Sequence, residues 1–212
     1  MNQTPMIPSL EEKRIVPVVK LDRVEDARPL AEALIRGGLP VAEVTFRTDA
    51  AEESIRTIKN EFPDMLVGAG TVINTEQAKR ALDAGASFMV SPGTSEKLLQ
   101  FAVDNAFPIF PGVCTPTEIM LALEYGLEIM KFFPAKQFGG IATMKALAGP
   151  FPQIRFMPTG GVNLDNMKEF LEFNKIIAIG GSWMVKDSLI KEGRFDEIVK
   201  LTADAVAKAK EV

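Results

Sequence analysis

The sequence predicts an α/β fold in which eight strands alternate with helices in a single domain, residues 1–212. Apolar strand-like segments recur roughly every 25 residues, and each is followed by a segment with helical spacing of its apolar residues. Strands that are apolar on both faces are typical of a parallel sheet covered by helices. Eight such units predict a closed (β/α)8 TIM barrel with a short N-terminal helix. A doubly wound open sheet is the alternative, weakened because no Gly-x-Gly-x-x-Gly motif follows the first strand.

The elements can be followed from the N-terminus. A short leading helix ends over residues 9–14, and the apolar, β-branched run Ile15–Val19 predicts the first strand. Further strands are expected at 41–46, 66–70, 88–90, 108–111, around Lys131, at 154–157 and at 176–179. Helices are expected at 24–36, 50–61, 75–84, 95–105, 116–125, 140–148 and 164–172, and near 187–191 and 195–210. Glycines at 37–38, 85 and 126 stop three of these helices.

Composition excludes several kinds of chemistry. The chain contains no histidine, which excludes His-based triads, histidine metal ligands and histidine general bases. The single cysteine, Cys114, rules out an intramolecular disulfide and fits a reducing compartment. The net charge of −4 gives no indication of nucleic acid or an anionic membrane as a partner. The N-terminus is polar and no long apolar run exists, so neither a signal peptide nor a transmembrane span is expected.

One lysine, Lys131, interrupts an otherwise apolar run that reads as a short buried strand. Strand side chains alternate, so Ile129, Lys131 and Phe133 share one face, and Pro134 ends the strand. Lysine is rarely buried unless something uses or neutralises it. Removal from water favours the neutral amine, which is a nucleophile for carbonyl carbons. The alternative is a lysine that reaches the surface or pairs with a core carboxylate.

The second predicted strand carries a carboxylate and places Glu43, Thr45 and Arg47 on one face. Apolar residues flank Glu43, so its carboxylate is costly there unless it is paired or hydrogen-bonded. Glu43 is therefore a candidate general acid–base group, with a structural ion pair to Lys131 or Arg47 as the alternative. Arg47 offers a planar fork for a substrate carboxylate, or else pairs with Glu43.

Two glycine pairs follow the last two predicted strands. Gly160-Gly161 comes after the strand at 154–157, and Gly180-Gly181 with Ser182 comes after the strand at 176–179. Adjacent glycines let backbone N–H groups approach an anion, and a helix that opens at Asn163 would add positive potential. These loops are the usual phosphate site of TIM barrels, so we expect phosphate binding here. Turn chemistry alone is the alternative for a single pair.

Taken together, the motifs resemble the class I 2-keto-3-deoxy-6-phosphogluconate (KDPG) and 4-hydroxy-2-oxoglutarate (KHG) aldolases over about residues 12–208. The motifs that carry the resemblance are VAEVTFRT at 41–48, GAGTV at 68–72, SPG at 91–93, PGV at 111–113, MKFFPA at 130–135, AGPF at 148–151, PTGGV at 158–162 and GGSW at 180–183. The resemblance implies cleavage of the phosphogluconate substrate to pyruvate and glyceraldehyde 3-phosphate. It also implies cleavage of 4-hydroxy-2-oxoglutarate to pyruvate and glyoxylate.

The resemblance further implies a role for each site residue. Lys131 would form the Schiff base with the keto carbon, and Glu43 would move protons. The implied substrate-binding residues are Arg47 and Thr71 at the pyruvate end, Gly160, Gly161 and Ser182 at the distal phosphate, and Pro92, Phe133, Thr159 and Gly181 in the rest of the site. The family is a cytoplasmic homotrimer that uses neither a metal nor a cofactor. Lys20 has no settled role, although a basic side chain there could lie near the substrate's anionic end.

Other functions stay open from the sequence alone. Barrels with the same paired-glycine phosphate site also isomerise or cyclise phosphosugars, using a carboxylate pair and no buried strand lysine. A non-catalytic binder of phosphorylated metabolites is the other alternative. Within the aldolases, the phosphogalactonate epimer or the unphosphorylated hydroxy-oxoglutarate could be the preferred substrate.

Overall fold

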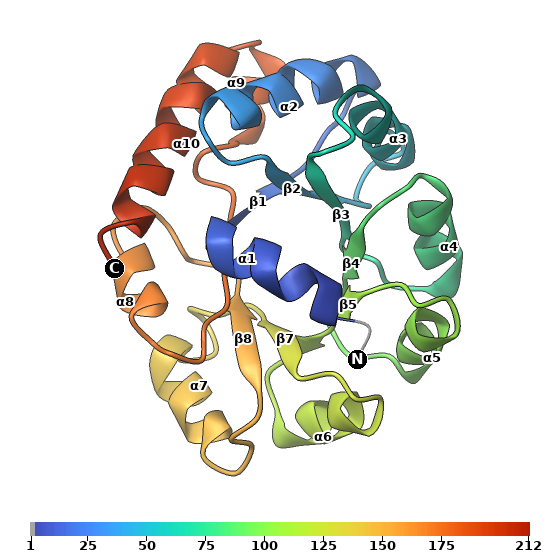
Figure 1. Cartoon of the computed structure of the whole chain (residues 1–212), viewed down its shortest axis with the longest axis vertical. Helices are drawn as coiled ribbons and strands as arrows, with labels where there is room; N and C mark the ends of the chain where they lie inside the picture. The colour runs from blue at the N-terminus through green and yellow to red at the C-terminus, as the bar shows by residue number, and fades with distance from the viewer. Residues whose placement is uncertain (1–2) are drawn as a thin grey trace.

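A computed structural model describes residues 3–212 as a curled parallel sheet wrapped by helices (Figure 1). Its strands are β1 (Ile15–Val19), β2 (Val41–Thr45), β3 (Leu66–Gly70), β4 (Phe88–Val90), β5 (Ile109–Phe110), β6 (Gly112–Val113), β7 (Ile129–Phe132), β8 (Arg155–Pro158) and β9 (Ile179–Gly181). Six of them pair in the order β5-β4-β3-β2-β1-β9, and the other three in the order β6-β7-β8. All of these pairings are parallel, as the apolar strand runs predict.

Helices follow the strands and cover the outside of the sheet (Figure 1). They are α1 (Ile7–Lys13), α2 (Ala27–Arg36), α3 (Ala51–Glu61), α4 (Thr75–Asp83), α5 (Glu96–Asp104), α6 (Pro116–Glu124), α7 (Gly140–Ala148), α8 (Met167–Leu171), α9 (Asp187–Lys191) and α10 (Phe195–Ala209), with 3₁₀ turns η1 (Thr4–Met6) and η2 (Val24–Asp26). Local sequence sets several of the boundaries. The Asn74 side chain accepts from the Gln77 amide to begin α4, and Thr115 with Glu118 forms a capping box before α6.

The first and last strands are neighbours, because β1 pairs with β9 on one side and with β2 on the other. The two sheets also adjoin each other. Pro111 separates β5 from β6, and isolated parallel bridges join Phe156 to Ile176 and Thr159 to Gly180 between the β8 and β9 regions. The sheet therefore curls back toward its own beginning, which the alternative of a doubly wound open sheet does not predict.

Three of the predicted boundaries are wrong. The fifth strand is split at Pro111, whose missing N–H cannot continue a ladder. The last strand is Ile179–Gly181 instead of 176–179, because Gly180 and Gly181 pair with Val16 and Pro17 of β1. Gly180-Gly181 thus lies inside a strand and not in the loop after it.

The third difference concerns α8, which begins at Met167 instead of near residue 164. The Asn163 side chain accepts hydrogen bonds from the amides of Asp165 and Asn166, which holds this segment as a turn. A turn over residues 163–166 therefore separates Gly161 from the first residue of α8, and the Asn163 carbonyl accepts from the Met167 amide at 3.0 Å.

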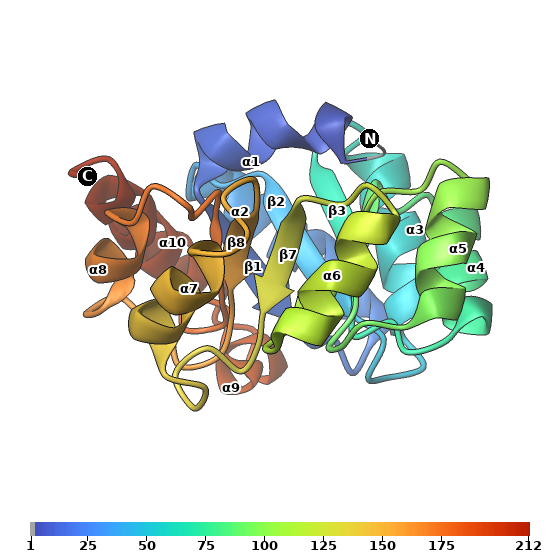
Figure 2. The same ribbon diagram turned by 90° about the horizontal axis from the view of Figure 1, so that it is seen from below.

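The leading helix α1 crosses one end of the sheet (Figures 1 and 2). Just before it, the buried Gln3 side chain donates to the carbonyls of Ile109 and Ile129 and accepts from the amides of Glu128 and Ile129. These residues lie where β5 and β7 begin, so α1 covers the N-terminal ends of the strands. The opposite end, where the strands finish, is left for the site.

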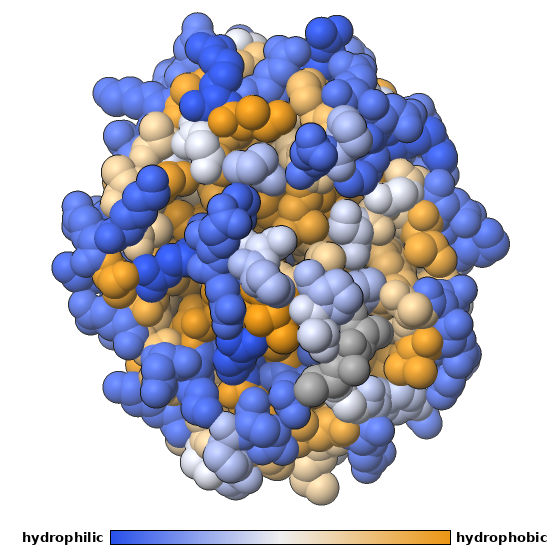
Figure 3. All heavy atoms as spheres, in the orientation of Figure 1, coloured by the Kyte–Doolittle hydropathy of each residue, from blue (hydrophilic) through white to orange (hydrophobic). Residues whose placement is uncertain are grey.

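On the face that carries α1, hydrophilic residues gather at the periphery, and hydrophobic residues are visible between α1 and the surrounding helices (Figure 3). Beneath it, one continuous cluster of buried apolar residues joins the inside of the sheet to the covering helices. Among residues 3–212 no helix combines the length and the apolar character that crossing a bilayer requires.

Candidate active site

Lys131 and Glu43 form a buried pair inside the curled sheet. Lys131 Nζ lies 3.2 Å from Glu43 Oε1, and their side chains are only 6% and 2% exposed. Lys131 comes from β7 and Glu43 from β2, so the sheet brings together two residues that are 88 positions apart. A buried amine and a buried carboxylate stabilise each other as a pair. The pairing also places a carboxylate that can accept a proton beside an amine that can release one.

Arg47 does not pair with Glu43, so that alternative is wrong. Its Nε donates to Thr45 Oγ1 at 3.1 Å, and the Thr45 hydroxyl in turn donates to the Val19 carbonyl at 2.9 Å. Thr45 therefore anchors Arg47 to β1 and leaves part of the guanidinium free to bind an anion.

Phe133 covers the lysine from the open side. Its ring centroid lies 5.1 Å from Lys131 Nζ, which places the amine over the ring face. Phe133 is 36% exposed, so it lies between the buried pair and the solvent-facing end of the sheet.

A cavity of about 190 Å³ opens at the ends of β1, β7, β8 and β9. Seven residues predicted for the site line it, together with Val18 and Val162: Arg47, Phe133, Thr159, Gly160, Gly161, Gly181 and Ser182. The cavity lies at the C-terminal ends of the strands, where parallel barrels build their sites. Arg47 brings positive charge to the same space as the glycine-rich loops.

The glycines of this cavity are required for two different reasons. Gly160 and Gly161 have φ of +96° and +79°, a conformation that strains any other residue. Gly180 and Gly181 are required for space, since a Cβ would lie 2.2 Å from Thr159 Oγ1 and 1.9 Å from the Trp183 ring. Gly160, Gly161 and Gly181 line the cavity, and Gly180 lies next to it on β9 without lining it.

Thr71 and Pro92 do not line this cavity but lie close to the Lys131–Glu43 pair along the strands. Thr71 directly follows β3 and has a φ of 56°, which is unusual for a β-branched residue and is a type of strain found at functional sites. The backbone of Pro92 packs on Gly112, which is the parallel partner of Lys131. Pro92 also lines a separate hollow of about 220 Å³ with its neighbours.

Lys20 lies in an ion cluster and not among the residues that line the cavity. Its Nζ is 2.6 Å from Asp22 Oδ1 and 3.8 Å from Asp187 Oδ2, and Lys191 binds the other oxygen of Asp22 at 2.8 Å. Hydrogen bonds from Lys191 and Lys20 lower the pKa of Asp22 to about 2. The cluster ties the end of β1 to α9, and its two carboxylates offset the charge of Lys20.

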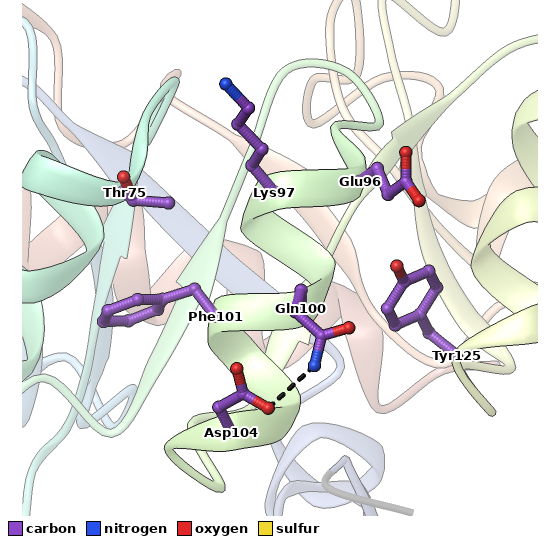
Figure 4. A pocket seen from close by; sticks show the side chains of 7 residues that line it. All are labelled: Thr75, Glu96, Lys97, Gln100, Phe101, Asp104 and Tyr125. Carbon is purple, nitrogen blue, oxygen red and sulfur yellow. Dashed lines mark hydrogen bonds between the residues drawn. The ribbon is translucent and has the colours of Figure 1, made fainter.

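A larger cavity, of about 470 Å³, lies elsewhere, on the outer surface around α5 (Figure 4). Phe101 and Thr75 lie on one side of the helix and Tyr125 on the other. Burial and nearby carboxylates raise the pKa of Tyr125. None of the predicted site residues lines this groove, and we assign the chemistry to the smaller cavity beside the buried pair.

The sequence matches the family described as KDPG and KHG aldolase over residues 6–201. The chain belongs to the KDPG and KHG aldolase family. The aldolase is 48% identical to the 2-dehydro-3-deoxy-phosphogluconate aldolase of Treponema pallidum, with 92% of each chain covered. It is 45% identical to the KHG/KDPG aldolase of Escherichia coli K12, again with 92% of each covered.

A solved structure of another family member has the same fold as this aldolase. The KDPG aldolase of Legionella pneumophila superposes with a TM-score of 0.90 at 41% identity, covering 93% of this chain and 96% of that one. That enzyme is described with pyruvate captured at low pH as a covalent carbinolamine intermediate. The protein is therefore a carbon–carbon lyase, and the family expected from the motifs is confirmed.

Sequence reasoning missed Gly70 as a site residue. It ends β3 within the GAGTV motif, and a Cβ on it would lie 2.2 Å from Glu43 Oε1. The contact depends on the parallel register, in which Thr45, on the same strand as Glu43, pairs with Gly70. Recognising it required knowing which strands are neighbours.

Proposed function

We propose that this aldolase cleaves 2-dehydro-3-deoxy-6-phosphogluconate to pyruvate and glyceraldehyde 3-phosphate through a Schiff base on Lys131. The observation that carries the proposal is the buried Lys131–Glu43 pair, 3.2 Å apart, beside a cavity bounded by glycine-rich loops. Such a pair supplies both a nucleophilic amine and a group that can exchange protons with it.

The covalent step begins when the neutral amine of Lys131 adds to the C2 carbonyl carbon of the substrate. Glu43 is within reach of Nζ to take up the proton that the amine releases. The same carboxyl group then gives a proton to the carbinolamine hydroxyl, which leaves as water and yields the iminium.

In the cleavage step Glu43 takes the proton of the C4 hydroxyl, and the C3–C4 bond breaks. The electron pair of the C3–C4 bond moves into the iminium, so the products are glyceraldehyde 3-phosphate and the enamine of pyruvate. A proton then adds to the enamine carbon, and hydrolysis of the iminium releases pyruvate and frees Lys131. The same steps convert 4-hydroxy-2-oxoglutarate to pyruvate and glyoxylate, since that acid has the same 2-keto, 4-hydroxy arrangement.

The positions of the residues support the binding roles that the family resemblance implies. Backbone amides of Gly160, Gly161 and Gly181 with Ser182 would hold the distal phosphate at the mouth of the cavity. Arg47, which lines the cavity, and Thr71, which follows β3, would hold the pyruvate carboxylate. Phe133 and Thr159 would shape the space between the two ends, and Pro92 is placed at the substrate by the family resemblance alone. A solved Zymomonas mobilis aldolase, 40% identical, is described with 3-phosphoglycerate, which also supports a phosphate-bearing ligand for this chain.

The gluconate epimer is the better candidate substrate. Relatives named for the phosphogluconate are 42–48% identical, whereas a structure described as native KDPGal is 26% identical. Steady-state rates on the two epimers and on 4-hydroxy-2-oxoglutarate test the choice directly.

We further propose that the whole chain is one domain in which the two sheets form a single closed (β/α)8 barrel. In support, the Lys131 amide donates to the Pro111 carbonyl at 2.9 Å, which links β7 to the residue between β5 and β6. The bridges from Phe156 to Ile176 and from Thr159 to Gly180 join the segment of β8 to the segment of β9. By resemblance to the family we place the enzyme in the cytoplasm as a homotrimer.

Borohydride reduction in the presence of pyruvate tests the central proposal. The wild-type chain should gain a reduced pyruvyl adduct, and peptide mass spectrometry should place it on Lys131. Lys131→Ala should gain none and should lose nearly all turnover. An adduct on Lys131→Ala would mean that another lysine is the nucleophile, with Lys20 the first candidate. A phosphosugar isomerase would form no adduct at all.

A further inference from the structure

Gly70, the last residue of β3, lies directly against the Glu43 side chain. A Cβ on Gly70 would be 2.2 Å from Glu43 Oε1, 2.5 Å from its Cγ and 2.7 Å from its Cδ. Ordinary contacts of a Cβ begin at about 3.4 Å. The Glu43 side chain therefore occupies the volume that any residue other than glycine would need at position 70.

Glycine is not needed at this position for its backbone conformation. Gly70 is absent from the glycines with positive φ, whereas the next residue, Thr71, has a φ of 56°. The sequence thus places threonine at the unusual conformation and glycine at the ordinary one. What glycine provides at position 70 is space.

The atom nearest to Gly70 is also the atom that faces the lysine. Glu43 Oε1 accepts from Lys131 Nζ at 3.2 Å and would meet a Gly70 Cβ at 2.2 Å. Both backbones are fixed, because Glu43 pairs with Gly68 and Thr45 pairs with Gly70 in the β2–β3 register. The Phe46 amide also donates to the Gly70 carbonyl at 2.7 Å. The carboxylate is then the group that must yield.

We propose that Gly70 is a positioning residue that holds the Glu43 carboxylate against Lys131. This inference rests on the acid–base role proposed above for Glu43. A methyl group at position 70 would push Oε1 from 2.2 Å to about 3.4 Å, a displacement of about 1.2 Å. Displacements of about 1 Å in a reacting group commonly cost on the order of 100-fold in rate.

The test compares Gly70→Ala with the wild-type chain. We expect kcat for the phosphogluconate, and the rate at which pyruvate methyl hydrogens exchange with deuterium, to fall roughly 10- to 100-fold. The KM should change far less, and borohydride should still trap pyruvate on Lys131 after long incubation. Gly68→Ala is the matched control on the same strand, because the three atoms nearest to a Cβ there all belong to the Phe88 ring, the first at 2.2 Å. It should lower the thermal midpoint yet keep kcat within about threefold of wild type.

A double-mutant cycle keeps the proposal testable if either alanine variant folds poorly. In a Glu43→Ala background the overlap is gone, so adding Gly70→Ala should cost little or no further stability. An equal loss of thermal midpoint in both backgrounds would overturn the proposal, as would unchanged exchange in Gly70→Ala or equal kinetic losses in the two glycine variants. Glu43→Gln tests the acid–base role of Glu43 separately from the positioning role of Gly70. If Glu43→Gln exchanges pyruvate hydrogens at the wild-type rate, the acid–base role of Glu43 is wrong. If Glu43→Gln loses exchange but Gly70→Ala keeps the wild-type rate, only the positioning role of Gly70 is wrong.

Discussion

Replacing Lys131 with methionine should destabilise the aldolase as well as inactivate it. Lys131 and Glu43 are 6% and 2% exposed, so water does not screen their interaction. Lys131→Met keeps most of the aliphatic stem but leaves the Glu43 carboxylate without its partner. Removing one member of a buried ion pair typically costs about 3–5 kcal/mol, because the remaining charge is uncompensated.

The loss should be visible in thermal unfolding. For a chain of this size each kcal/mol shifts the midpoint by about 2–4 °C, so the single variant should melt roughly 6–20 °C below wild type. It should still fold, since domains commonly have about 5–15 kcal/mol of stability. The double variant Lys131→Met/Glu43→Gln has no buried charge left and should regain most of the lost stability.

The assay is circular dichroism at fixed protein concentration on the wild-type chain and the three variants, including Glu43→Gln. The difference between the double variant and the sum of the single variants gives the coupling between the two side chains. A wild-type melting temperature for Lys131→Met would refute the reasoning, because it would mean that Glu43 is not held as a buried partner of the lysine. A double variant no more stable than Lys131→Met would refute it as well.

Three further predictions can be checked with standard assays. Glu43→Gln should lower kcat by roughly 10²- to 10⁴-fold while pyruvate is still trapped by borohydride over long incubation, and near-normal turnover would pass the acid–base role to ordered water. Replacing Gly161 with a bulky residue should raise KM for the phosphorylated substrate much more than for 4-hydroxy-2-oxoglutarate. Gly161 has a φ of +79° and a Cβ on it would lie 2.4 Å from the Lys136 side chain, so a larger residue would distort the proposed phosphate loop. Equal losses on both substrates would mean that the loop has only a structural role. Light scattering should give about three times the 23.1 kDa chain mass, and a monomer at micromolar concentration would contradict the trimer.

The strands and the two central residues could be predicted because their signals are local. Lys131 interrupts an apolar run and Glu43 has apolar neighbours, and neither observation requires knowledge of the fold. That the two side chains meet could not be predicted from the spacing alone. Period-two alternation gives the face on which a residue lies, but only the order of strands decides which residues on that face are opposite each other.

The errors have the same origin. Gly180-Gly181 was expected in a loop because glycine pairs usually mark turns. In the structure β1 lies beside them, and pairing with Val16 and Pro17 draws them into β9. The start of α8 was missed because the side chain of Asn163 forms a local turn that apolar spacing does not reveal. In each case a specific partner overrode the local pattern.

Three strand glycines in this aldolase serve a common purpose that spacing could not reveal. A Cβ on Gly70 would overlap Glu43, one on Gly112 would overlap the Pro92 backbone at 2.3 Å, and one on Gly180 would overlap Thr159 Oγ1 at 2.2 Å.

In each of these overlaps the partner is a residue of the candidate site that comes from a different strand or loop. Larger side chains inside a parallel barrel would fill its interior in packed layers. Glycines at these three strand positions leave room for the Glu43 carboxylate, the Pro92 turn and the Thr159 side chain. The same absence of side chains that makes these strands weak secondary-structure signals is what allows the site to form among them.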